Sequence, residues 1–288
     1  MSNQNQKQLA RKAGYVRFVA MFMKVMNYLM TLYVHYGSMA LVISKELNNT
    51  QESRQLDFFF IGKQVEGKGR VCYNGVKRGG SMFGHLQVKS CYSFQESTIL
   101  IDALVKMAKE KQMDALAICD TDNMYGAFEF YEACQKYHIK PIFGVEASIL
   151  IDQEVYPFTL LAKDDDGYFS LVRIVSDINL SDEGAIDIQE LLAYKHHLYV
   201  ISASDDGIVE RYIAKDMEKE AERYMRSFRE AFGDNYLVMM QNHGLANQEV
   251  NNKRLLAIAN FVNVKVIWGN DVRYLRPQEA ITVDLLQA

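Results

Sequence analysis

The 288-residue chain lacks the features that mark several protein classes. Its four cysteines form no CxxC pair and no ligand-like cluster, so a reduced, cytoplasmic protein with cysteines as small apolar fillers is the simplest interpretation. No GxxxxGK[ST] sequence is present, which leaves nucleotide binding by a P-loop without support. The 32 Lys and Arg are outnumbered by 36 Asp and Glu, and this argues against a protein that mainly grips phosphates with a basic surface.

Uninterrupted apolar runs of membrane-spanning length are also missing. The most apolar stretch, Val16 to Ile43, is broken by Arg17, Lys24 and His35. A charge near the centre of a bilayer costs roughly 2.5–3.5 kcal/mol, and no small-residue cleavage site follows an apolar core here. We therefore expect neither a membrane anchor nor a signal peptide.

The charges that are present divide the chain into two parts. Residues 1–81 contain 12 Lys and Arg against 4 Asp and Glu, a net charge of +8, whereas residues 82–288 have a net charge of −12. Arg78-Gly79-Gly80, just before Met82, can be encoded by a purine run of the kind found in bacterial ribosome-binding sites. Residues 1–81 form a basic extension of unknown structure. We hypothesise that natural translation starts at Met82 and that residues 1–81 are read-through of upstream DNA. The alternative is that they are a genuine, naturally translated extension.

From residue 82 onward, strand-like and helix-like patterns alternate with short connections, which is typical of a mainly parallel sheet with helical crossovers. The expected strands are 84–88, 114–119, 140–145, 158–162, 197–202, 236–240 and 264–268. Apolar residues at helical spacing predict helices over 100–108 and 124–134, around 217–228, and over 255–262. About seven such units suit a barrel, and barrel sites lie at the carboxyl ends of the strands.

Acidic residues follow several of these strands, namely Asp120 and Asp122, Glu146, and Asp271. Each could cap a helix or make a turn. Several at equivalent positions on different strands favour a shared pocket. Elsewhere, Asp164 to Asp166 are expected to cap a helix, His196 and His197 to lie at the surface on opposite sides of a strand edge, and His243 to lie in a loop.

Several segments occur in an order that resembles the N-terminal PHP (polymerase and histidinol phosphatase) domain of bacterial DNA polymerase III alpha subunits. They are His85–Ser93, Ala117–Gly126, Ile139–Glu146, Phe158–Lys163 and Gly269–Leu275. The resemblance runs from Met82 to the end of the chain and is nearest to the alpha subunits of low-GC Gram-positive bacteria. It implies an α/β fold, a distorted seven-stranded TIM-like β/α barrel over residues 82–288. In active members two or three metal ions, bound by His, Asp and Glu, activate water for phosphoester hydrolysis.

The resemblance also implies which residues stand at the metal-ligand positions. Four carboxylates remain there, Glu96, Asp120, Glu146 and Asp271, and the nitrogen ligands are replaced. The replacements are Gln87, Lys89, Thr121, Pro157, Ser204 and Arg273. Asp120, Glu146 and Asp271 are the candidate metal ligands that persist, and Mg2+ or Mn2+ is the ion such oxygen donors would hold. We expect no cofactor in this chain.

Two of the replacements are cationic, and cations relieve the repulsion between converging carboxylates as a metal would. We hypothesise a relic pocket in which Lys89 or Arg273 pairs with Asp120, Glu146 or Asp271. No residue is assigned a catalytic role.

The resemblance implies a cytoplasmic DNA replication protein, with the PHP domain as a scaffold in a DNA-directed DNA polymerase, a nucleotidyltransferase whose catalytic palm lies downstream of this sequence. The implied partners are the remaining domains of the alpha subunit and, through the full-length protein, DNA and replisome proteins such as the sliding clamp. We expect a truncated chain. The alternative function is a stand-alone PHP-type metal-dependent phosphoesterase or 3′-5′ exonuclease.

Overall fold

The computed structural model describes residues 84–202, 206–245 and 247–287. The apolar run from Val16 to Ile43, the start proposed at Met82 and the pocket residue Ser204 lie outside these residues. None of the helices within the described ranges is long and apolar enough to cross a membrane.

Seven strands form a single sheet in the order β1-β2-β3-β5-β6-β7, with the short β4 paired to β2. Their bounds are β1 Ala115–Thr121, β2 Lys140–Ile151, β3 Glu154–Ala162, β4 Ile186–Asp187, β5 Leu198–Ser202, β6 Tyr236–Met240 and β7 Lys265–Trp268. The pairs β1–β2, β2–β4, β5–β6 and β6–β7 are parallel. β3 is antiparallel to both β2 and β5. The sheet is therefore mainly parallel, as expected, with one reversed strand.

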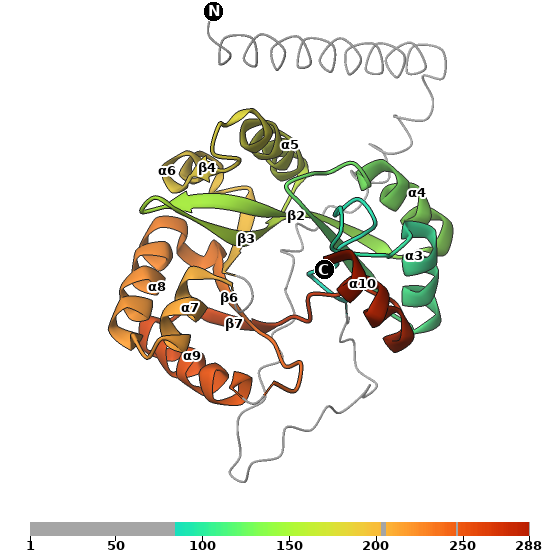
Figure 1. Cartoon of the computed structure of the whole chain (residues 1–288). Coiled ribbons are helices and arrows are strands. Elements are labelled where there is room, and N and C mark those ends of the chain that lie inside the picture. The colour runs from blue at the N-terminus through green and yellow to red at the C-terminus, as the bar shows by residue number, and fades with distance from the viewer. Residues whose placement is uncertain (1–83, 203–205, 246, 288) are drawn as a thin grey trace, which may run out of the picture. The chain divides into compact units, whose positions relative to one another are not determined.

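The helices lie around the sheet: α3 and α4 on one side, α5 and α6 on another, and α7 to α9 on a third (Figure 1). Their bounds are α3 Ile101–Glu110, α4 Ala127–Tyr137, α5 Asp165–Leu180, α6 Ile188–Leu191, α7 Ile208–Ala214, α8 Glu218–Phe232, α9 Gln248–Val262 and α10 Ala280–Gln287. Single 3-10 turns lie at Leu192–Tyr194, Gly233–Asn235 and Pro277–Glu279. The four predicted helices correspond to α3, α4, α8 and α9.

The barrel-like α/β fold is confirmed, with six of the seven predicted strands; the seventh strand of the structure is β4, which the sequence did not predict. Segment 84–88 forms only an isolated bridge, Val88 with Val272. Its carbonyls at His85 and Val88 accept hydrogen bonds from Ala117 and Cys119 of β1, at 2.9 and 2.8 Å. Four residues here, 85 to 88, span the same stretch as three residues of β1, 117 to 119, and one extra residue is the mark of a β-bulge. The irregular pairing explains why a regular strand is absent.

This segment joins the two ends of the sheet. On its other side the backbone NH of Lys89 donates to Val272 (3.0 Å), and the NH of Val272 donates to Gln87 (3.1 Å). We call residues 85–89 and their partners on β1 and at Val272 the seam. Residues 85–89 bond to β1 on one side and to Val272, which follows β7, on the other. The seam therefore closes the sheet into a ring.

Alternation along the strands divides the core into an inner and an outer layer. The inner layer contains Ala117 and Cys119 of β1, Ile142 of β2, Leu161 of β3 and Met239 of β6. Leu116 and Ile118 of β1 pack outward against α3 and α4. This division determines which strand-end residues face the interior.

The capping prediction at Asp164 and the loop prediction for His243 are confirmed, whereas His196 and His197 lie in the turn before β5 and not on a strand. The side chain of Asp164 accepts a hydrogen bond from the NH of Gly167 (2.8 Å) at the start of α5. His197 is partly exposed beside Asp164 (3.1 Å between Nδ1 and Oδ2), and His196 is exposed. His243 lies in the loop between β6 and α9.

Candidate functional site: a buried ion-pair cluster at one end of the barrel

Five charged side chains meet beside the seam, at the middle of β2 and level with the carboxyl end of β1. Lys89 is 1% exposed, and its ammonium contacts two carboxylates, Glu146 Oε1 at 2.5 Å and Glu96 Oε2. Arg273 pairs with Asp271 Oδ2 through both Nε and Nη2, each at 2.8 Å. We call Lys89, Glu96, Glu146, Asp271 and Arg273 the ion cluster. It contains two cations and three carboxylates.

The pairing hypothesis is confirmed for two of the three carboxylates it named. Lys89 pairs with Glu146, and Arg273 pairs with Asp271. Lys89 also pairs with Glu96, the carboxylate that follows the seam.

The local sequence explains how Lys89 reaches this position. Residues 87 and 89 lie on the same face of an extended segment, so Gln87 and Lys89 both point to Glu146. Gln87 Nε2 donates to Glu146 Oε2 (3.1 Å), the oxygen that Lys89 leaves free. Thr121, which pairs with Glu146 in the β1–β2 register, donates through Oγ1 to Glu96 Oε2 (3.0 Å).

The electrostatics of the ion cluster keep Lys89 charged. Burial alone would lower the pKa of Lys89, but the carboxylates of Glu146 and Asp271, together with hydrogen bonds to Glu146 and Glu96, outweigh it and raise the pKa above its ordinary value. Burial raises the pKa of Glu146, and Lys89 offsets part of that shift. The guanidinium of Arg273 behaves like Lys89: burial opposes its charge, Asp271 favours it, and its pKa is raised.

The structure does not bring Asp120 into the ion cluster. Its side chain lies on the face of Leu116 and Ile118, opposite to that of Thr121. There the 2%-exposed carboxylate accepts hydrogen bonds from Ser90 N (2.7 Å), Ser90 Oγ (2.8 Å) and Ser93 Oγ (2.6 Å). Asp120 therefore fixes the loop after the seam, and its oxygens face that loop.

Two further predicted positions contribute no ligand. Pro157 of β3 pairs with Ser148 of β2 and has no side-chain donor. Asp122, which the sequence also placed at a strand end, accepts from Ser148 N (2.8 Å) and Oγ (2.7 Å). Burial raises the pKa of Asp122. It therefore serves to join β1 to β2.

The residues at this site do not fit the metal cluster that active members of the family resembled by this sequence contain. The ammonium of Lys89 stands between Glu96 and Glu146, where a cation would have to sit to use both carboxylates. Across residues 84–202, 206–245 and 247–287, no group of three or more His, Cys, Asp and Glu side chains is arranged to hold a metal ion.

Sequence reasoning missed Gln241, the residue directly after β6. Its Nε2 donates to Gln87 Oε1 at 2.8 Å, so it extends the polar network from Glu146 to the end of β6. A polar residue after an apolar strand was the available signal, but glutamine carries no charge or metal-binding character that would single it out.

Comparison with models of protein families identifies the family of this chain. The family model described as "PHP domain" matches residues 85–243, which include the seam, Glu96 and Glu146. The chain belongs to the PHP domain family. The matched part begins at His85, the first residue of the seam.

Curated relatives of this PHP domain include several DNA polymerase III alpha subunits. The chain is 29% identical over 220 residues to that of Borreliella burgdorferi and 30% identical over 226 residues to that of Aquifex aeolicus. It is 30% identical over 209 residues to that of Bacillus subtilis. Each alignment covers 72% of this chain and 19% of the relative, so the chain spans about a fifth of their length. The three identities differ by only one percentage point and favour none of these bacteria.

Among solved structures, the chain is similar to an amidohydrolase from Chromobacterium violaceum, with a TM-score of 0.45 and 12% identity. That match covers 70% of this chain and 96% of the other.

Proposed function

We propose that this PHP domain serves DNA replication as part of a DNA polymerase III alpha subunit, and that its former metal site has become a structural ion cluster. Homology to the PHP region of alpha subunits supports the first part. The single observation that carries the second is the buried ammonium of Lys89 between Glu96 and Glu146.

A tethered ammonium supports this role because it cannot do what a metal does in phosphoester hydrolysis. A divalent ion holds a water molecule and lowers its pKa, whereas a fully protonated lysine offers only N–H donors. Lys89 keeps its proton, since its pKa is raised. The cluster thus holds the seam, β1 and β2 together through fixed charges.

The wider role follows from the relatives and belongs to the same proposal. The partners would be the other domains of an alpha subunit, with the sliding clamp and DNA reached through the whole protein in the cytoplasm. The net charge of −12 over residues 82–288 makes binding of DNA by this domain's charge alone unfavourable. The low-GC Gram-positive assignment and the truncation stay predictions.

Metal content and hydrolysis, measured together on the 288-residue protein, test the proposal. After incubation with Mn2+, Mg2+ or Zn2+ and desalting, we expect less than stoichiometric metal. We also expect no release of nucleotides from a DNA 3′ end and no hydrolysis of a phosphomonoester.

A matched variant identifies the site responsible for any activity that appears. Glu146→Gln removes a carboxylate from the ion cluster, and Glu154→Gln removes one from the start of β3, next to the β2–β3 turn. Metal-dependent hydrolysis lost in Glu146→Gln and kept in Glu154→Gln would contradict the structural role. It would instead establish the stand-alone phosphoesterase or 3′-5′ exonuclease.

A further inference from the structure

The ion cluster contains hydrogen-bonding groups that its own ion pairs leave unused. Lys89 has three N–H donors, and its ion pairs with Glu96 and Glu146 use two of them. Asp271 receives Arg273 on Oδ2 alone. The other oxygen, Oδ1, is buried, and no described residue donates to it. Such a buried acceptor is costly unless a donor reaches it.

Lys89 and Asp271 both border the interior of the ring. The bridged pair of the seam, Val88 and Val272, packs outward against α3 and α4. Because neighbouring residues of an extended chain point to opposite faces, Lys89 and Arg273 point inward. Asp271 is held beside them by its two contacts with Arg273.

The ammonium of Lys89 and the carboxylate of Asp271 are close without direct contact. Burial lowers the pKa of Lys89, whereas the carboxylates of Glu146 and Asp271 raise it, so Asp271 lies within electrostatic range of the ammonium. The ion pairs that the structure shows for Lys89 are nevertheless with Glu96 and Glu146. A gap between a donor and an acceptor on the same interior is where a water molecule forms a bridge.

Thr159 supplies a third unused group on this interior. In the strand register it lies between Glu146 of β2 and Ile201 of β5. Its neighbours Phe158 and Leu160 pack on the outer face of β3, so Thr159 faces inward, as Glu146 does. Thr159 is 0% exposed, and no described residue bonds to its Oγ1.

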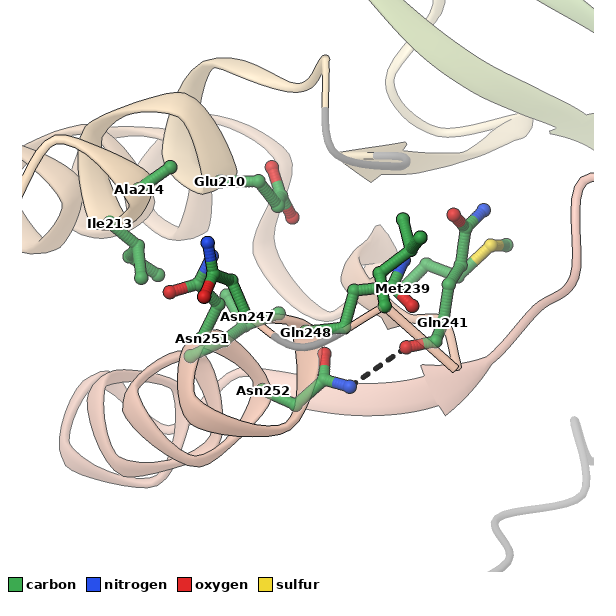
Figure 2. Close-up of a pocket in the computed structure, with 11 residues that line it drawn as sticks. Glu210, Ile213, Ala214, Met239, Gln241, Asn247, Gln248, Asn251 and Asn252 are labelled. Carbon is green, nitrogen blue, oxygen red and sulfur yellow. Dashed lines mark hydrogen bonds between the residues drawn. The ribbon is translucent and has the colours of Figure 1, made fainter. Parts of the chain in front are cut away.

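Gln87 also points inward, but its amide is engaged elsewhere. Its Nε2 donates to Glu146 (3.1 Å), and its Oε1 accepts from Gln241 Nε2 (2.8 Å). Gln241 is itself tied to α9, because Asn252 Nδ2 donates to its backbone oxygen at 2.8 Å (Figure 2). These bonds fix the Gln87 amide, so the two unused oxygens need another partner.

We propose that a buried water molecule joins Lys89, Asp271 and Thr159 inside the ring. The water accepts from the third N–H of Lys89 and donates to Asp271 Oδ1 and Thr159 Oγ1, which makes three hydrogen bonds, the usual number for a buried water. The ammonium repels a metal ion and the carboxylate repels an anion, so the site selects a neutral molecule. This inference rests on the structural role proposed for the ion cluster and extends the cluster to β3.

Magnetic relaxation dispersion of the 288-residue protein in water enriched in oxygen-17 tests the proposal, because it counts water molecules that stay bound while the protein tumbles. Thr159→Val keeps the shape of the side chain without the hydroxyl and should lose one long-lived water relative to wild type. Thr159→Ser keeps the hydroxyl and should retain that water. The control Thr282→Val, at an exposed position of α10, should also retain it.

The urea midpoint of Thr159→Val is a second measurement, because the presence of the water decides its sign. A hydroxyl bonded to a water loses that bond on substitution, so we expect the midpoint to fall below that of wild type. A hydroxyl without any partner would be an unpaired buried group, and its removal would raise the midpoint.

Two results would overturn the proposal. They are an unchanged count of long-lived waters in Thr159→Val and a urea midpoint of this variant above that of wild type. Neither experiment measures metal or hydrolysis, so failure here leaves the proposed replication role untouched.

Discussion

At the scale of single residues, the ion cluster explains how converging carboxylates persist without the family's nitrogen ligands. Glu146 is 8% exposed and lies next to Glu96, so the ionised pair would be strongly unfavourable if it stood alone. Lys89 contacts both, and Gln87 satisfies the remaining oxygen of Glu146. A buried charge pair adds little net stability over an apolar equivalent, but removal of one member is costly.

Lys89→Met is therefore expected to destabilise the protein by roughly 3–5 kcal/mol, since it leaves the buried carboxylate of Glu146 and the partly exposed one of Glu96 without their cation. The midpoint of urea unfolding at pH 8 measures the loss. Lys136→Met is the matched control: Lys136 and its partner Asp102 are both more than half exposed, and this pair should be worth less than about 1 kcal/mol. Equal effects of the two substitutions would show that the ion cluster has no special role.

The loss in the free energy of unfolding caused by Lys89→Met should depend on pH. Burial already raises the pKa of Glu146, and loss of Lys89 removes the main influence that lowers it. A carboxyl whose pKa is raised in the folded state binds more protons when folded than when unfolded. Its contribution to stability therefore falls as pH rises from the unfolded-state pKa to the folded-state pKa. Lys89, whose pKa is raised, contributes fully at any pH below about 10.

We thus expect the difference between wild type and Lys89→Met to be larger at pH 8 than at pH 5, as judged by urea midpoints. Adding Glu146→Gln to Lys89→Met should remove most of this pH dependence, because the titrating carboxyl is gone. A difference that is independent of pH in Lys89→Met would place its cause outside Glu146.

The residue types alone predicted much of the ion cluster. The positions of the other residues depend on three-dimensional packing, which the sequence does not show. The cationic replacements Lys89 and Arg273 indicated charge compensation directly. The sequence could not show which of Asp120 and Thr121 points toward the ion cluster. Neighbouring residues of a strand point to opposite faces, and which face is the inner one depends on how the sheet packs. Gln241 lies 154 residues from Gln87 in the chain, and only closure of the ring brings the two together.

At the scale of elements, the β2–β3 hairpin is the part that the sequence pattern did not predict. The predicted strand 140–145 is only the first half of Lys140–Ile151, and 158–162 is only the second half of Glu154–Ala162. Between them Asp152 and Gln153 have φ values of +49° and +69°, as in a type I′ turn. Because such turns favour Asn-Gly, Asp-Gln gives a weak signal, and the reversal of β3 could not be foreseen.

Gln153→Gly should relieve this turn. A non-glycine residue in the left-handed region costs about 1–2 kcal/mol, and the greater chain freedom of glycine when unfolded offsets part of the gain. We expect a net stabilisation of about 0.5 kcal/mol in thermal or urea unfolding. The control Gln135→Gly, on the exposed face of α4, should destabilise by about 1 kcal/mol. Destabilisation by Gln153→Gly would contradict the turn geometry.

At the scale of the whole molecule, the seam joins the part of the chain before α3 to the part after β7. Its backbone hydrogen bonds connect His85 and Val88 to β1, and Gln87 and Lys89 to Val272. Contacts over such long sequence separations form late, because loop closure must come first. The ion cluster lies on this seam, so it secures the junction on which closure depends.

Native-state hydrogen exchange can test whether the ion cluster secures the seam in particular. In wild type we expect the amides of Lys89, Cys119 and Val272 to exchange as slowly as those in the middle of β6, through global unfolding. In Lys89→Met the seam amides should exchange faster than those of β6, because the ring can open locally once Glu96 and Glu146 lose their shared cation. Lys136→Met should leave both groups unchanged. If Lys89→Met accelerated seam and β6 amides equally, the ion cluster would stabilise the fold as a whole and the seam would not be its point of action.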